Sequence, residues 1–246
     1  MWVPLLQRLY GVFAAPVLGL IVFGVVCPLI LLAPTLSLRR RIGRGGVRLG
    51  LLSIGIPLRV RGLQHLPAGA CLAVANHASY MDGLVLTAAL PERYTFVVQD
   101  GAGRWPYVGL VLRRMGCSFV NRSSARDGAA QTRQLIRRVQ EGESLAVFAE
   151  GTFEPDPGLL PFKKGAFLIA ARAGVPVVPV GIRGTRDFFG GHRRGLRWSR
   201  IEVEVGPPIA ASTDAAALRD AARSAVLLRC GEPDRHAAPE PNGDLL

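Results

Sequence analysis

A histidine, a serine and an aspartate lie within seven residues of one another, in the segment 76–82. They directly follow the apolar run 72–75, which is typical of a buried strand. In open α/β folds, the loop after a strand presents its side chains at the carboxyl edge of the sheet, where ligands bind. A histidine there can act as a general base, with a carboxylate to orient its ring. The segment therefore predicts a catalytic pair formed by His77 and Asp82.

The spacing of this pair restricts where its members can lie. Positions five apart on a continuous helix point about 140° away from each other, so His77 must precede the helix that carries Asp82. Ser79 and Asp82 have the spacing of a capping box, which predicts Ser79 as the N-cap and Asp82 in the first turn. On these residues alone, an ordinary loop histidine beside a helix-capping aspartate is an equally good interpretation.

Two further strand ends carry polar residues. The segment 116–122 is typical of a short strand that ends on an arginine, and the segment 147–152 of a strand that ends on an acid, a glycine and a hydroxyl. In this order, with the segment 76–82 before them and the apolar run 175–180 after them, they resemble the four motifs of the glycerolipid acyltransferases. The 1-acyl-glycerol-3-phosphate acyltransferases are the most similar members. The resemblance spans about residues 57–208.

The resemblance implies an α/β fold, with a mixed sheet flanked by helices, and an activity. A fatty acyl group would pass from acyl-CoA or acyl carrier protein to the free hydroxyl of a lysophospholipid, foremost 1-acyl-glycerol-3-phosphate, to give phosphatidic acid. No metal or other cofactor is implied. His77 would take the proton as the hydroxyl attacks the thioester directly, Asp82 would hold the ring, and backbone amides near Gly151 would stabilise the oxyanion. The implied substrate-binding residues are Arg122, Glu150, Gly151, Thr152 and Lys163.

The chain departs from the family pattern at two positions. Many lysophosphatidate enzymes of this family carry an arginine where this chain has Phe153, and a basic residue where it has Gln99. Two cationic phosphate contacts are therefore missing. Either Arg122 and Lys163 supply more of the phosphate binding, or the acceptor is a different lysolipid.

Composition limits the partners without choosing among them. Thirty basic residues against 18 acidic ones give a formal charge of +12, which favours anionic partners such as nucleic acid, phosphorylated metabolites or acidic lipid headgroups. No nucleic-acid recognition motif is present, so we expect no nucleic-acid partner. The only lysines are the adjacent Lys163 and Lys164. A non-catalytic, membrane-associated binder of anionic lipid is a rival interpretation.

Residues with nucleophilic side chains offer another rival, a serine or cysteine hydrolase. Ser79 lies in no Gly-x-Ser-x-Gly elbow, and a capping role already accounts for it. The four cysteines have no metal-type spacing, which argues against a zinc site or a disulfide framework. We expect Cys71 and Cys117 to be small apolar core residues.

The segment 11–33 contains no charged residue and is long enough to cross a hydrocarbon core of about 30 Å as a helix. Prolines and glycines interrupt it, so a re-entrant pair of helices in one leaflet competes with a straight span, and a signal peptide is a third alternative. Five arginines follow it, which by the positive-inside bias predicts a catalytic domain on the cytoplasmic face of the inner or plasma membrane. We expect these arginines to meet anionic headgroups; they are Arg39, Arg40, Arg41, Arg44 and Arg48.

Beyond this segment, short apolar strands alternate with helices. The predicted strands are 58–61, 71–75, 94–98, 118–120, 145–148, 177–182 and 201–205. The predicted helices are 80–90, 107–115, 128–141 with Asp127 as N-cap, 165–173 and 214–229. We therefore expect three parts: a membrane anchor with a basic juxtamembrane helix (1–55), an acyltransferase domain (56–230) and a disordered tail (231–246).

Overall fold

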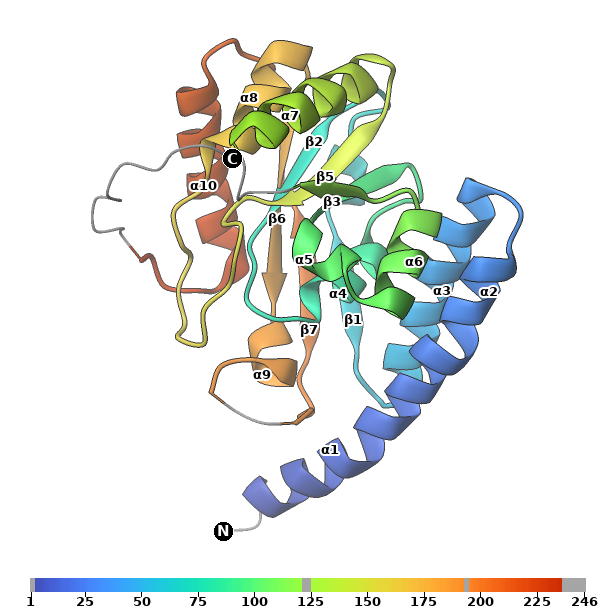
Figure 1. The fold of residues 1–246 in the computed structure, drawn as a ribbon. Coiled ribbons are helices and arrows are strands. Elements are labelled where there is room, and N and C mark those ends of the chain that lie inside the picture. The colour runs from blue at the N-terminus through green and yellow to red at the C-terminus, as the bar shows by residue number, and fades with distance from the viewer. Residues whose placement is uncertain (1–2, 121–124, 193–194, 236–246) are drawn as a thin grey trace.

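A computed structural model describes residues 3–120, 125–192 and 195–235 (Figure 1). Its centre is a seven-stranded sheet with the strand order β1-β7-β6-β2-β5-β3-β4. The strands are β1 Leu58–Arg61, β2 Leu72–Ala75, β3 Tyr94–Gln99, β4 Ser118–Val120, β5 Ser144–Phe148, β6 Val177–Arg183 and β7 Ile201–Val205. Neighbouring strands are parallel except for β6 and β7, which are antiparallel, so the sheet is mixed, as predicted.

Helices connect and cover the strands. They are α1 Val3–Gly19, the π-helix η1 Leu20–Val26, α2 Cys27–Leu32, α3 Leu36–Ser53, the 3₁₀ turn η2 Leu63–His65, α4 Asp82–Ala89, α5 Asp100–Gly103, α6 Pro106–Arg114, α7 Ala125–Gln140, α8 Lys164–Ala173, α9 Thr185–Phe189 and α10 Ala215–Cys230. All seven predicted strands are present and differ from the prediction by at most one residue at either end. The predicted α/β class is therefore confirmed.

Both faces of the sheet are covered, which explains why its central strands are continuous apolar runs rather than alternating ones. In β2, Leu72 and Val74 belong to one hydrophobic cluster and Ala73 and Ala75 to the other, and all four are buried. Helices α7, α8 and α10 cover the face of Leu72, at the upper left of Figure 1. Helices α3 and α4 pack on the opposite face. The central strands are thus held between two cores.

Two predicted helix starts are wrong. Helix α4 begins at Asp82 rather than at Tyr80, and its N-cap position is Met81, not Ser79. A tight turn after β2, held by the Asp82 carboxylate, delays the helix by two residues. Helix α7 begins at Ala125, so Asp127 lies inside the helix and is not its N-cap.

The N-terminal segment forms a helical hairpin, and its first arm is one continuous rod. The helices α1, η1 and α2 follow one another without a break, and the wide π-turn of η1 ends just before Pro28, which has no N–H to donate to a preceding turn. The chain reverses at 33–35, and α3 returns alongside the rod (Figure 1). We call the segment 3–53 the N-terminal hairpin.

A close contact between α3 and a side chain of η1 helps to hold the N-terminal hairpin together. A Cβ atom on Gly46 would lie 2.3 Å from a methyl of Val26, so α3 can approach η1 at this point only with a glycine.

Two side chains bond to the residues that follow α3. The indole N–H of Trp198 donates to the carbonyl of Gly55 at 2.9 Å, and the hydroxyl of Tyr10 donates to the carbonyl of Ile54 at 2.9 Å. The junction between the hairpin and the sheet is therefore held by one hydrogen bond from α1 and one from the segment before β7.

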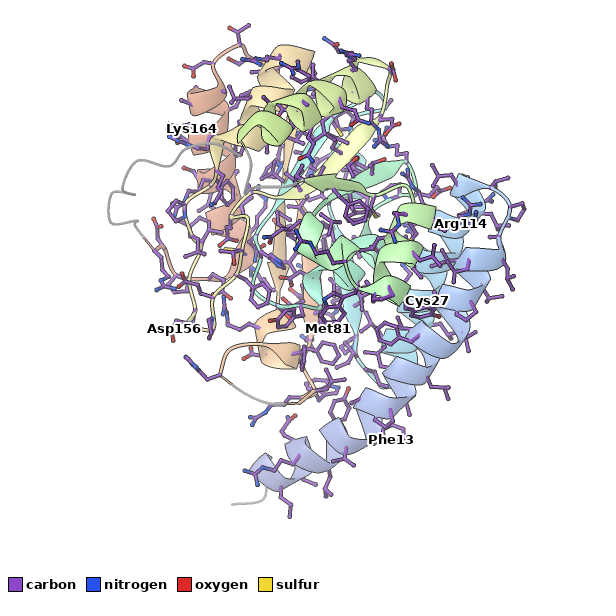
Figure 2. The ribbon with its side chains drawn as sticks, in the orientation of Figure 1. Phe13, Cys27, Met81, Arg114, Asp156 and Lys164 are labelled. Carbon is purple, nitrogen blue, oxygen red and sulfur yellow. The ribbon has the colours of Figure 1, made fainter. Side chains whose placement is uncertain are left out.

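Much of the hairpin is both apolar and exposed. Within the described residues, one helix is long and apolar enough to cross a membrane, Leu5–Leu32, with a mean hydropathy of 2.7. Leu9, Val12, Phe13 and Leu20 on this helix are more than half exposed. Figure 2 shows Phe13 on the part of the helix that extends beyond the rest of the molecule. The prediction of an apolar N-terminal segment is confirmed, and whether it spans or re-enters the bilayer stays open.

Three of the arginines that we expected to meet lipid headgroups donate to groups of the protein. Arg39 donates to the carbonyl of Arg114, at the end of α6, at 3.3 Å. Arg40 donates to the carbonyl of Met115 at 3.0 Å and to the hydroxyl of Thr95 at 2.7 Å. Arg48 donates to the carbonyl of Ala88, at the end of α4, at 2.8 Å. These guanidinium groups therefore hold α3 to the body.

The C-terminal segment starts in contact with the body. Helix α10 begins after Asp214, whose carboxylate accepts from the amides of Ala216 and Ala217. After α10, Gly231–Arg235 runs beside Leu159, and residues 236–246 of the predicted disordered tail lie outside the described residues. The division of the chain into three parts stays a prediction.

Candidate active site

Strands β2 and β5 end together at one edge of the sheet, beside β6, which continues to Arg183. Ala75, the last residue of β2, is in register with Phe148, the last residue of β5, and with Val180 of β6. The residues that follow β2 and β5 are therefore neighbours, and they lie beside the end of β6. Asn76 fixes this edge, because its buried amide donates to the carbonyl of Ile182 at 3.0 Å and accepts from the amide of Ile182 at 2.7 Å.

His77 and Asp82 form the predicted pair. The Nδ1 atom of His77 lies 2.9 Å from Oδ2 of Asp82. Asp82 is fully buried, and the same oxygen accepts from the amides of Ala78 at 2.6 Å and Ser79 at 2.8 Å. These donors offset the cost of burying a carboxylate. With Nδ1 engaged by a carboxylate, the neutral ring carries its proton there, and Nε2 is the nitrogen left to accept one.

The turn between the two residues explains how five positions of separation bring them together. The hydroxyl of Ser79 accepts from the amide of Met81 at 3.0 Å and donates to the carbonyl of Phe189. Half of the predicted capping box is therefore present, since Asp82 accepts from Ser79 as expected, while the Ser79 hydroxyl bonds two positions ahead rather than three. A serine bonded in this way is structural.

Glu150 lies behind the histidine and is 2% exposed. Its Oε1 accepts from the amide of His77 at 2.5 Å, and its Oε2 accepts from the amide of Leu160 at 2.7 Å. Burial raises the pKa of Glu150 to about 8, against the two amide bonds, which lower it. This carboxyl group joins the main chain of His77 to the loop 151–163.

Aromatic rings enclose the imidazole. The ring of Phe148 stacks on His77 with centroids 4.3 Å apart, and the edge of Phe153 meets it at 4.7 Å. Tyr80, which is 75% exposed, packs against Phe153 at 4.6 Å. The His77 side chain keeps 19% of its surface exposed, so one side of the ring stays accessible.

The other predicted substrate-binding residues have different surroundings. Gly151 has φ 77° and its amide donates to the carbonyl of Phe148 at 3.1 Å, so this amide closes a turn rather than facing an oxyanion. Thr152 is exposed. Lys163 is exposed at the start of α8, and its amide donates to the carbonyl of Ala149 at 2.8 Å. This bond brings Lys163 beside the end of β5.

Two positions concern the predicted phosphate contacts. Arg122 lies outside the described residues. Gln99 ends β3 in register with Val120, the last residue of β4.

Three residues that sequence reasoning missed shape this site. They are Asn76, which locks the strand ends, Phe148, which stacks on the imidazole, and Glu150 in its role toward the His77 amide. The only available signal was the position of each at a strand end, because their partners lie far away in the chain.

The cysteines show no sign of a nucleophile. Burial raises the pKa of the Cys117 thiol to about 11, so the thiol is protonated at neutral pH. Cys71 is fully buried, with its sulfur 3.1 Å from the Tyr94 hydroxyl. In the described part of the chain, no group of three or more histidine, cysteine or acidic side chains is arranged to hold a metal ion.

Comparison with known proteins identifies relatives of this chain. The family described as Acyltransferase matches residues 57–183. The chain is 35% identical over 153 residues to the chloroplastic 1-acyl-sn-glycerol-3-phosphate acyltransferase BAT2 of Brassica napus, covering 61% of this chain and 44% of that protein. It is 31% identical over 147 residues to the 1-acyl-sn-glycerol-3-phosphate acyltransferase of Borreliella burgdorferi, covering 59% of each. It is 30% identical over 191 residues to the human alpha enzyme of the same name, covering 74% of this chain and 68% of that one.

The chain thus spans between about half and two thirds of the length of these relatives. A solved structure has the same fold. The crystal structure of the 1-acyl-sn-glycerophosphate acyltransferase PlsC from Thermotoga maritima aligns with a TM-score of 0.72 and 24% identity, over 90% of this chain and 92% of that one. Since the alignment extends over nearly the whole chain, it includes most of the N-terminal hairpin as well as the sheet.

Proposed function

This chain belongs to the acyltransferase family, and from that premise we propose that it transfers a fatty acyl group from a thioester to the free hydroxyl of a lysophospholipid. The donor is acyl-CoA or acyl carrier protein, and the acceptor is 1-acyl-glycerol-3-phosphate, which gives phosphatidic acid. The observation that carries the proposal is the 2.9 Å hydrogen bond between His77 and the buried Asp82, at the end of the central strand.

The proposed chemistry proceeds by direct transfer. Nε2 of His77 takes the proton of the acceptor hydroxyl as its oxygen attacks the thioester carbonyl. The resulting oxyanion collapses, the carbon–sulfur bond breaks, and the imidazolium returns the proton to the departing thiolate. Asp82 holds the Nδ1 tautomer and stabilises the imidazolium. No covalent acyl-enzyme forms, in keeping with the structural bonds of Ser79 and the burial of Cys71.

The acceptor assignment rests on the relatives and on charge. The relatives named above are 1-acyl-sn-glycerol-3-phosphate acyltransferases. A formal charge of +12 suits an anionic headgroup. We propose that Arg122 and Lys163 contact the phosphate, and that the loop after Glu150 lies beside it.

One observation favours a second acceptor. Phe153 stands where many lysophosphatidate enzymes carry an arginine, and its edge packs against the His77 ring. A phenyl ring cannot bind a phosphate, so a lysolipid with a diester headgroup, or with no phosphate, fits this position better than a phosphomonoester does. This alternative keeps the same chemistry and changes only the headgroup.

We place the reaction at a membrane surface. The exposed apolar side chains of the N-terminal hairpin would lie in lipid, and the arginines that follow the apolar segment favour a catalytic domain on the cytoplasmic face of the inner or plasma membrane. Membrane lipid and the acyl donor are then the only partners that the proposal needs.

The proposal is tested by incubating the purified full chain with labelled acyl-CoA, or acyl carrier protein, and a panel of lysolipids. We expect labelled phosphatidic acid from lysophosphatidate, and no label on the denatured, washed protein. Label on Ser79, Cys71 or Cys117 that hydroxylamine releases as an acyl hydroxamate would favour a hydrolase-like enzyme. No transfer to any lysolipid would contradict the proposed activity.

The same assay separates the two acceptors. If lysophosphatidate is the acceptor, Arg122→Ala raises its apparent KM, with a loss of about 1.5 to 3 kcal/mol for a charge-assisted hydrogen bond, and Phe153→Arg is neutral or beneficial. If the wild type ignores lysophosphatidate but acylates another lysolipid, and Arg122→Ala has no effect, the second acceptor is the right one.

A further inference from the structure

We propose that the segment Gly231–Arg235, together with Arg186 and Arg223, positions His77 by holding the loop 151–163 in place. We call Gly231–Arg235 the C-terminal strap. The inference rests on the proposed function, since it assigns these residues a role in placing the proposed base.

The C-terminal strap adds a short stretch of backbone pairing to the loop. The amide of Leu159 donates to the carbonyl of Pro233 at 2.8 Å, and the amide of Arg235 donates to the carbonyl of Leu159 at 3.3 Å. Leu159 and Asp234 form a parallel bridge. Leu159 is 1% exposed, so this pairing lies over a buried side chain rather than on a loose surface loop.

Glu232 of the strap bonds both to the loop and to Arg186. Its Oε2 accepts from the amide of Gly158 at 2.6 Å, and its Oε1 accepts from Nε of Arg186 at 2.8 Å. Both side chains of this ion pair are 13% exposed. Arg186 also donates to the carbonyls of Glu154 and Pro155 at 2.7 and 3.0 Å, so one ion pair holds the loop at several points.

A second arginine holds the loop from helix α10. Arg223 donates to the carbonyl of Leu159 at 2.9 Å and to the carbonyl of Leu160 at 3.3 Å. It also pairs with Asp234 of the strap. Arg223 therefore connects α10 and the strap to the loop at Leu159 and Leu160, and Leu160 is the residue whose amide donates to Glu150.

From there the path to the histidine is short. The amide of Leu160 donates to Glu150 at 2.7 Å, and Glu150 accepts from the amide of His77 at 2.5 Å. Phe153, on the same loop, contacts the imidazole at its edge. The loop thus holds the main chain of His77 through Glu150, and the strap holds the loop. Figure 2 shows Asp156 of this loop at the edge of the molecule, on the side away from the N-terminal hairpin.

The residues that hold the loop lie outside the part of the chain that matches the family model. That match ends at residue 183, whereas Arg186, Arg223 and Glu232 come after it. The match to the family model therefore assigns these three residues no role.

The test uses Glu232→Ala and Glu232→Gln in the full chain. Glu202→Gln is the matched control, since Glu202 forms an ion pair with Arg59 between β7 and β1, away from the loop. For each variant we would measure kcat, KM for the acyl donor, the midpoint of thermal unfolding, and hydrogen exchange in peptides covering residues 75–81 and 157–163. Arg186→Lys, which keeps the charge, serves as the conservative variant.

We expect Glu232→Ala to lower kcat by about 10- to 100-fold, the scale of a small misplacement of a catalytic group. Its KM for the donor should stay near the wild-type value, and exchange should rise in both peptides. Glu232→Gln, which keeps one acceptor oxygen, should lose less, Arg186→Lys should keep most activity, and the control should match the wild type.

Two results would overturn the inference. One is a folded Glu232→Ala protein with wild-type kcat, and the other is faster exchange in 157–163 with none in 75–81. Hydrogen exchange needs no substrate, so it tests whether the strap positions His77 even if the proposed acceptor is wrong. If the wild type transfers no acyl group at all, the proposed function fails, while the exchange comparison still decides whether the strap holds His77. A Glu232→Ala protein that does not fold leaves the decision to Glu232→Gln and Arg186→Lys.

Discussion

In most proteins charged side chains are exposed and large apolar side chains are buried. The edge of the sheet around His77 and the N-terminal hairpin depart from this rule in opposite ways. At the sheet edge, charged and polar groups such as Asp82, Glu150 and Asn76 are buried and hydrogen-bonded. On the hairpin, large apolar side chains such as Phe13 and Leu20 are exposed. Buried polar groups define a fixed geometry, whereas exposed apolar ones define an affinity for a surface. We therefore expect chemistry and location to be set by separate regions, which substitutions can disturb one at a time.

The largest effect is expected at the proposed base. His77→Ala removes the proton acceptor, and we expect kcat to fall by about 10² to 10⁴. The fold should be unaffected, because the backbone bond from residue 77 to Glu150 does not need the side chain. Turnover and the midpoint of thermal unfolding check this, and near wild-type turnover in a folded variant would rule out the proposed mechanism.

A smaller loss of turnover is expected for Asp82→Asn. The amide keeps one oxygen for the donors of the turn but no longer stabilises an imidazolium or selects the Nδ1 tautomer. A comparison of kcat and KM with His77→Ala checks the order. An Asp82→Asn enzyme as active as the wild type would mean that the pair is only structural.

On the hairpin, we expect polar substitutions to change location and leave chemistry intact. Phe13→Glu and Leu20→Glu each remove apolar surface worth about 1.5 to 3 kcal/mol when buried in lipid, so vesicle binding should weaken by about tenfold or more for each. Leu228→Glu on α10 is the matched control, because Leu228 is 78% exposed on another face. Sedimentation with vesicles, beside kcat in detergent, separates the two effects. Equal losses for control and hairpin variants would show that the hairpin surface is not special.

The buried acid at the sheet edge should be visible in the pH dependence of stability. The pKa of Glu150 is raised to about 8, so the folded state binds a proton that the unfolded state releases near its ordinary pKa. The free energy of unfolding should therefore fall as pH rises from about 5 to 8, by up to about 1.4 kcal/mol per pH unit. Urea unfolding of the wild type and Glu150→Gln across this window checks the sign, since the variant should lack this slope. Parallel curves would contradict the assignment.

The smallest effect concerns the packing inside the hairpin. Gly46→Ala forces a methyl against Val26 and should destabilise by about 1 to 3 kcal/mol. Gly45→Ala, its neighbour on the same helix, meets no atom within 4 Å and should stabilise by about 0.5 to 1 kcal/mol. Thermal unfolding of the two variants gives the difference directly. A shift of the same sign in both would mean that α3 does not pack on η1 as described.

What the sequence could predict was local. The strands were predictable because each is a short run of mostly apolar residues, as in β2, or of alternating apolar and polar residues, as in β7. The His77–Asp82 pair was predictable because its members are five positions apart. The hydrogen bond from the His77 amide to Glu150 joins residues 73 positions apart, and the bond from Arg40 to Met115 joins residues 75 apart. No periodicity or spacing reports such contacts. For this reason Glu150 was expected to bind substrate, and Arg40 to meet lipid, whereas both have partners inside the protein.

The two hydrogen bonds that fasten Ile54 and Gly55, from Tyr10 and Trp198, have a kinetic consequence. They lie where the hairpin joins β1, and they restrict bending of the hairpin relative to the sheet at this junction. If the hairpin rests in lipid, the sheet edge with His77 is held at one height and tilt above the bilayer. Such an enzyme meets its acceptor by lateral diffusion in a plane, and its rate should follow the mole fraction of lysolipid in the surface rather than the bulk concentration.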